Sequence, residues 1–186
     1  MLPLAFAQFV LTFLFDAHFI TYKYRSDFSS AFSFFDNGLS FLRKNHWRDH
    51  YSLSLELNEL AAKCSLVLGD LISLTIISDR VIKYARCFDD KLETLFISMT
   101  SLGYASKIAE LVEKGLSILS DLGEPLPRTI SRDDAVKDIN QTLLLLDGLA
   151  DEDLFNYRKM TDQKKLMTMR FLAKLENACQ EVNPAL

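Results

Sequence analysis

Apolar side chains recur every three or four residues along almost the whole sequence from Asp27 onward. Positions such as Phe28, Ala31, Phe32 and Phe35 therefore fall on one face of an α-helix. Only 6 Gly and 4 Pro interrupt the 186 residues, whereas proteins with many tight turns or short strands use both residues more often. The sequence predicts an all-α protein of about eight helices. A hydrophobic content of 49% and a charged content of 25% are typical of a globular domain.

Capping residues and glycines set the expected ends of these helices. Asp27 is a plausible N-cap for the first helix, and Gly69 is expected to end the second. Ser131 and Asp134 form a capping box that begins a later helix. Between 71 and 87 a β-branched run could also form a strand, but no second strand pattern exists to pair with it. The expected helical segments are 28–42, 47–68, 71–87, 91–102, 105–119, 132–147, 151–157 and 161–182.

The spacing of two glycines predicts how the helices are arranged. Leu68-Gly69 and Leu102-Gly103 lie in similar helix-turn-helix patterns, and they are separated by the 34 residues of a tetratricopeptide unit. Val81 occupies a place where paired helices usually carry a small residue, so the units are degenerate. We expect a tetratricopeptide-like α-solenoid of stacked antiparallel helical pairs. The predicted divisions are an apolar N-terminal segment, a helical-repeat region, a linker and C-terminal helices, at 1–26, 27–123, 124–131 and 132–182.

The N-terminal segment is apolar from Leu2 to Phe15 apart from two polar residues. A transmembrane helix needs about 20 apolar residues, and a secretory signal begins with basic residues. The first positive side chain here is Lys23. We expect a buried first helix or the artefactual start of a truncated chain. A signal peptide or membrane anchor is the alternative.

Charge and cysteine usage restrict the partners and the compartment. The net charge is −4, which gives no overall attraction to nucleic acid or to an anionic membrane. The three cysteines, Cys64, Cys87 and Cys179, are odd in number and have apolar neighbours, so they are interpreted as reduced core residues. The expected location is cytoplasmic.

The sequence contains no recognisable catalytic or cofactor motif. Its six glycines never come close enough to form a phosphate-binding loop. His46 and His50 have the spacing of a zinc-binding helix, with Asp49 beside them. The residue after the first of these histidines is Trp47, not the glutamate of a metalloprotease, and no third ligand can be identified. We predict no enzyme activity, cofactor or metal. A helical metal-dependent enzyme using His46, Asp49 and His50 is the alternative.

Several packing residues together carry a resemblance to a known family. They run in the order Ala31, Gly38 and Leu42; Trp47-x-x-x-Tyr51-x-Leu53-x-Leu55-Glu56-Leu57; Ala61-Ala62; Gly69; Leu119-x-x-Leu122-Gly123; Leu126-Pro127; Thr161-Asp162; and Met169-Arg170-x-Leu172. This pattern resembles the helical region that follows the predicted AAA-type ATPase in multi-sensor hybrid histidine kinases and related serine/threonine kinases. The resemblance covers about three quarters of the chain, and the motifs consist mainly of helix-packing residues.

The resemblance implies a scaffold between an ATP-hydrolysing switch domain and downstream sensor and kinase domains. No catalytic residue of those domains has a counterpart in this chain. The predicted partners are therefore proteins or adjacent domains, in signal transduction. The predicted interaction surface lies on the first helices of the pairs, near Tyr51, Glu56 and Tyr104.

Overall fold

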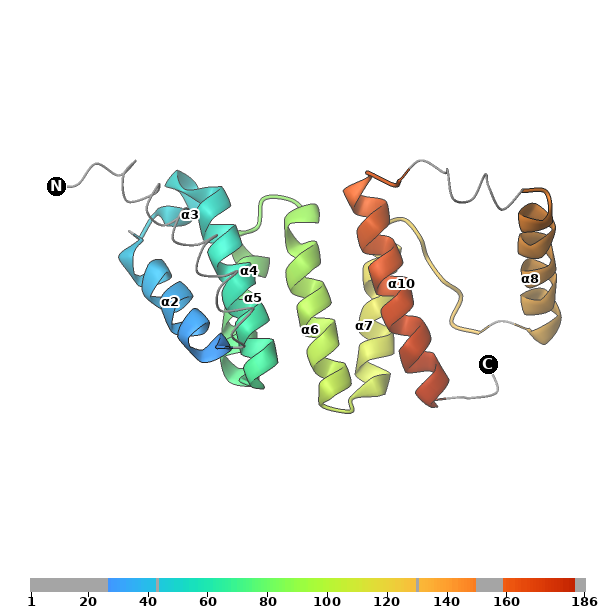
Figure 1. Cartoon of the computed structure of the whole chain (residues 1–186), viewed down its shortest axis with the longest axis horizontal. Helices are drawn as coiled ribbons and strands as arrows, with labels where there is room; N and C mark the ends of the chain where they lie inside the picture. Colours follow the sequence, from blue (N-terminus) through green and yellow to red (C-terminus); the bar gives the residue numbers. More distant parts are fainter. Residues whose placement is uncertain (1–26, 43, 130, 150–158, 183–186) are drawn as a thin grey trace. The chain divides into compact units, whose positions relative to one another are not determined.

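The computed structural model describes residues 27–42, 44–129, 131–149 and 159–182, and Figure 1 shows that helices dominate these segments. No β-strand occurs among them, which confirms the all-α prediction, including a helix for the β-branched run. The chain divides into two compact units, Met1–Leu111 and Val112–Leu186. The predictions for 1–26 and 151–157 concern residues outside the described ranges. None of the described helices combines the length and the apolar character that crossing a bilayer requires.

The first unit is built around one central helix. Its elements are α2 (Phe28–Phe41), α3 (His46–Asp49), α4 (Tyr51–Leu68), α5 (Leu71–Tyr84), the 3-10 helix η1 (Asp89–Lys91) and α6 (Leu92–Tyr104). Helix α4 contacts α2, α3, α5 and α6, as expected for a helix with apolar residues on more than one face. The core includes Phe35 from α2, Leu57 and Ala61 from α4, and Ile77 from α5.

Local capping explains why the chain reverses where it does. The side chains of Asp27 and Asp70 accept hydrogen bonds from the backbone N–H groups of Ser30 and Ser73, each at 3.0 Å, and so begin α2 and α5. Gly69 ends α4 in the left-handed conformation, with a φ of 72°. The caps at Asp27 and Gly69 were predicted from the sequence, whereas the Asp70 cap was not.

Three expected boundaries in the first unit differ from the structure. The helix expected from Trp47 is interrupted at His50, whose φ of −138° separates the one-turn α3 from α4. Helix α5 ends at Tyr84 because Ala85 is extended. Gly103, the counterpart of Gly69 in the proposed repeat, lies inside α6, and Ser106 takes the left-handed conformation with a φ of 55°. The two glycines therefore do not play equivalent roles.

The second unit contains α8 (Arg132–Asp147), α10 (Gln163–Val182) and most of α7 (Ile108–Asp121). The predicted capping box is confirmed: Asp134 N–H donates to Ser131 Oγ at 3.1 Å, and Ser131 Oγ–H donates to Asp134 Oδ2 at 2.6 Å. The linker expected at 124–131 is non-helical where it is described. The two units divide upstream of it, inside α7, and α7 and α10 line one pocket in the second unit.

The cysteine prediction is correct for one of the three residues. Cys64 is buried on α4, whereas Cys87 and Cys179 are exposed, and all three are free thiols. Cys87 follows the end of α5, so it lies in a loop rather than on a packed helix face. Cys179 lies on an exposed face of α10. Apolar neighbours in the sequence were therefore not sufficient evidence of burial.

Candidate functional site: a basic aromatic pocket beside α3

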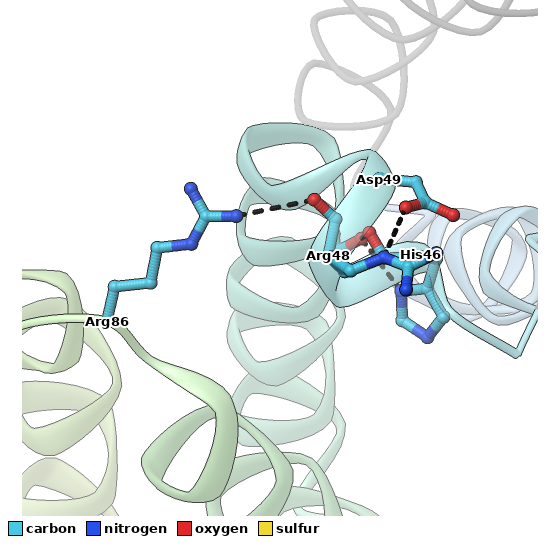
Figure 2. A network of polar contacts seen from close by, with 5 residues as sticks. His46, Arg48, Asp49 and Arg86 are labelled. Carbon is cyan, nitrogen blue, oxygen red and sulfur yellow. Dashed lines mark hydrogen bonds and ion pairs between the residues drawn. The ribbon is translucent and has the colours of Figure 1, made fainter.

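The three residues of the alternative metal site, His46, Asp49 and His50, take separate roles. His46 Nδ1 lies 2.7 Å from Ser54 Oγ on α4. Asp49 accepts a hydrogen bond from Arg48 Nε at 2.8 Å, and Figure 2 shows this pair on the opposite side of the short helix from the Arg86 contact. His50 lies beyond the helix as its C-cap. No cluster of three His, Cys, Asp or Glu residues suited to a metal occurs in the described part of the chain.

The His46 contact instead fastens α3 to α4. Ser54 is buried, and its hydroxyl donates to the His50 carbonyl at 2.7 Å. Because a hydroxyl has only one proton, this arrangement assigns the imidazole proton to Nδ1 of His46, which then donates to Ser54 Oγ. Burial, followed by the charges of Arg80 and His50, lowers the pKa of His46 below its ordinary 6.5. The imidazole is therefore neutral at pH 7.

An open pocket of about 560 Å³ lies beside α3 in the first unit. Its walls come from the residues before α3, from α3 itself, from the C-terminal end of α5 and from the loop that follows. Four of the lining residues are cationic, although the whole chain is acidic. The lining residues are Lys44, Asn45, His46, Trp47, Arg48, Arg80, Tyr84 and Arg86.

Arg80 is held in this pocket by a buried amide. Its Nη1 donates to Asn58 Oδ1 at 3.2 Å, and Asn58 Nδ2 in turn donates to the Ser54 carbonyl at 2.6 Å. Asn58 is fully buried on α4. The bond to a neutral amide positions the guanidinium without neutralising it, and Arg80 has no carboxylate partner within the described ranges.

Arg86 reaches the pocket from the loop after α5. Its Nη2 donates to the Arg48 carbonyl at 3.3 Å, the contact that Figure 2 shows between the two segments. The guanidinium lies over the Tyr51 ring, 4.0 Å from its centroid. Tyr51 Oη accepts from the Arg86 backbone N–H at 2.8 Å and donates to the Asp90 carboxylate. Burial, and next the bond to Asp90, raise the pKa of Tyr51.

Aromatic rings form the other wall of the pocket. Trp47 stacks on Tyr84, with 5.4 Å between the ring centroids and 17° between the planes. Trp47 also contacts Tyr51 edge to face, at 6.0 Å. The indole Nε1–H is shielded from solvent and has no hydrogen-bond partner among the described residues. Basic and aromatic groups thus line the same cavity.

The predicted interaction residues do not form one surface. Tyr51 is half-buried and hydrogen-bonded to Asp90, just before α6. Tyr104 is 69% exposed but lies at the far end of α6. At 1.5 Å per residue, it is about 18 Å along the helix axis from the start of α6. Glu56 is exposed on α4. The structure brings Tyr51, but not Tyr104, to the basic aromatic pocket.

A second exposed feature of the first unit is apolar. At the start of α5, Ile72 is 77% and Ile76 is 55% exposed, and their i, i+4 spacing puts them side by side on the outer face. Leu68 and Leu71, on either side of the α4–α5 turn, are also exposed. We call these four residues the α5 apolar surface.

The second unit also exposes apolar groups. No residue of α8 is buried, although Ile139, Leu143 and Leu146 form the apolar stripe predicted from the sequence. Helices α7 and α10, with residues 126–128, line a separate apolar pocket of about 480 Å³. The predicted stripe on α8 is thus present, but it does not contribute to the core.

Sequence reasoning found Trp47, His46 and Tyr51 but missed Arg80, Tyr84 and Arg86. These residues lie more than 30 positions from α3, and only the packing of α5 on α4 brings them to it. A concentration of basic residues at the end of α5 was the available signal. In comparisons with known proteins, no family model, curated protein or solved structure matches this chain.

Proposed function

We propose that this chain is a non-catalytic, cytoplasmic helical scaffold that binds a protein partner through the α5 apolar surface. The observation that carries the proposal is the exposure of Ile72 and Ile76. Large exposed apolar patches on a folded domain mark interaction sites, whereas single exposed apolar residues are ordinary. Here four such residues lie at one end of a helical pair.

The fold does not require these side chains. The inner face of α5 is supplied by Leu74, Ile77 and Val81, which are at most 5% exposed. The outer isoleucines are therefore not part of the core, and polar residues in their place would reduce the stability of the isolated domain only slightly. Their presence is explained by a partner that covers them.

Two further observations support an interaction role. The helical pair α4 and α5 reverses through a glycine cap, in keeping with a tetratricopeptide-like arrangement of stacked pairs. The resemblance to the helical region of multi-sensor kinases gives ATPase and kinase modules as candidate partners and signal transduction as the setting. The apolar stripe on α8 offers a second contact element of the helix-in-groove kind.

Site-specific photo-crosslinking in cells tests the proposal. A photoreactive residue at Ile76 is expected to give one dominant protein adduct, whereas the same residue at Ser33, an exposed position on α2, is not. The adduct partner is then identified and purified, and its affinity for the full chain is measured. Ile72→Asp combined with Ile76→Asp should weaken binding at least ~10-fold, while Ser33→Asp should not change it.

Circular dichroism must show that the double variant retains its helices. Equal adducts at Ile76 and Ser33 would refute the proposal. So would unchanged affinity of the purified partner for the folded double variant.

A further inference from the structure

We propose that the basic aromatic pocket binds the phosphate of a phosphorylated side chain on a protein partner. The α5 apolar surface is a separate feature because none of its four residues lines the pocket, although Ile76 lies one turn before Arg80 on α5. The inference rests on the proposed function in one respect, namely that the partner is a protein.

The guanidinium groups are held in place by neutral acceptors. Asn58 Oδ1 holds Arg80, and the Arg48 carbonyl holds Arg86. Each bond uses one N–H group of a guanidinium that has five. The remaining donors and the full positive charge stay available, which is the state needed to bind an anion with two or more acceptor oxygens.

The balance of charge in and beside the pocket favours a dianion. Two carboxylates lie close by: Asp49 pairs with Arg48, and Asp90 accepts from Tyr51. Lys44, Arg80 and Arg86 have no ion-pair partner in the described segments. Four cations line the pocket, and against these two carboxylates they leave a net charge of +2, more than one carboxylate would balance. A phosphate monoester carries close to two negative charges at pH 7 and three strong acceptor oxygens.

The form of the site favours a single phosphorylated side chain over a polymer or a membrane. The pocket is local, and the whole chain has a net charge of −4, which repels nucleic acid and anionic lipid surfaces at longer range. The stacked rings of Trp47 and Tyr84 provide an apolar wall for the carbon atoms that carry the phosphate.

The only tryptophan of the chain lines the pocket, so its fluorescence reports binding directly. The probes are a short peptide with one phosphothreonine, the same peptide without phosphate, inorganic phosphate, and vesicles of phosphatidylserine and phosphatidylcholine. We expect the phosphopeptide to change the emission of Trp47 saturably, with at least ~10-fold higher affinity than the unphosphorylated peptide. Inorganic phosphate should displace it.

Variants that each remove one positive charge, inside or outside the pocket, locate the binding site. Lys44→Gln, Arg80→Gln and Arg86→Gln should each weaken phosphopeptide binding by about 10-fold. Lys107→Gln removes the same charge from an exposed position after the far end of α6 and should change affinity less than about 2-fold. Lys44 is exposed and its side chain makes no hydrogen bond or ion pair with the residues that the structure describes, so its variant is informative even if Arg80→Gln is destabilised.

Three outcomes would overturn the inference: equal affinity for both peptides, an equal loss in Lys107→Gln, or tighter binding to vesicles with the same dependence on Arg80. The second outcome would mean diffuse attraction, and the third would mean a membrane ligand. The Ile72→Ser and Ile76→Ser double variant, which adds no carboxylate one turn from Arg80, should bind the phosphopeptide normally. If crosslinking at Ile76 succeeds and phosphopeptide binding fails, only this inference is wrong.

Discussion

Asn58 connects the stability of the first unit to the geometry of the pocket, and Asn58→Ala tests that connection. Its side chain is fully buried and holds both Arg80 Nη1 and the Ser54 carbonyl. The substitution removes both bonds but leaves the Ser54 carbonyl within the helix, where a backbone N–H can satisfy it. The main loss is therefore the bond from the charged guanidinium to the amide oxygen.

The size of the effect follows from these contacts. A hydrogen bond to a charged group contributes about 1.5–3 kcal/mol. Replacing Asn by Ala inside a helix recovers up to about 0.7 kcal/mol of helix propensity. We expect a net destabilisation of about 2 kcal/mol, which lowers the urea midpoint by about 1 M at the slope typical of a small domain.

Urea unfolding followed by the fluorescence of Trp47 measures this change within the first unit. Thr75→Ala is the matched control, because Thr75 Oγ1 makes the same kind of bond to the carbonyl four residues earlier, at 2.8 Å, but is exposed. It should change stability by less than about 0.5 kcal/mol. A similarly small effect for Asn58→Ala, or independent effects of Asn58→Ala and Arg80→Gln in a double-mutant cycle, would refute the assigned role of this bond.

Two other predictions concern α4. Burial, with the charges of Glu93, Glu56 and Asp90, raises the pKa of Glu59 to about 7 against its ordinary 4.5. This side chain therefore weakens folding progressively as the pH rises from about 4.5 to about 7, and the loss is complete above that range. Glu59→Gln should add about 1 kcal/mol of stability at pH 8, after allowance for partial exposure, and nothing below about pH 4.5, as measured by urea unfolding. Gly69→Ala should lower the free energy of unfolding by about 1 kcal/mol, because the φ of 72° at this position disfavours alanine. The added methyl group would meet no atom within 4 Å, so the loss comes from the backbone conformation alone. An unchanged midpoint in thermal unfolding would contradict this prediction.

Local sequence signals predicted the parts of the fold that depend on neighbouring residues. The caps at Asp27 and Ser131 require only a side chain and a backbone N–H three residues later, so the sequence determines them. Asp70 caps α5 in the same way, but it was not predicted. The helical periodicity likewise gave the positions of the main helices. The Gly69 turn was predicted for the same reason, since a left-handed residue strongly favours glycine.

The misplaced features depend on tertiary contacts. The break at His50 is stabilised by Ser54, which bonds to both His46 and the His50 carbonyl. No periodicity argument contains that information, because the pattern of apolar residues continues through the break. The glycine spacing failed at Gly103 for a related reason: the helix continues to Tyr104 and the chain turns at Ser106 instead.

The sequence identified only part of the candidate site, because the residues of the site come from two separate segments of the chain. His46 and Trp47 attracted attention as unusual residues in a short segment. Arg80 and Arg86 looked like ordinary surface cations, because basic residues near a helix C-terminus are common. Only the packing of α5 on α4 shows that Arg80 reaches a buried amide and that Arg86 spans to the Arg48 carbonyl.

One stripe of α4 explains how the core and the pocket come from the same helix. Ser54, Asn58, Ala61 and Ser65 recur at helical spacing, and each is at most 1% exposed. Small side chains along this stripe let neighbouring helices approach closely, while its first two residues are polar and supply the bonds to His46 and Arg80. An apolar residue at position 58 would preserve the packing but release the guanidinium. The polar start of α4 therefore serves the placement of charge in the pocket rather than the hydrophobic core, and stability and anion binding should respond together to changes at Asn58.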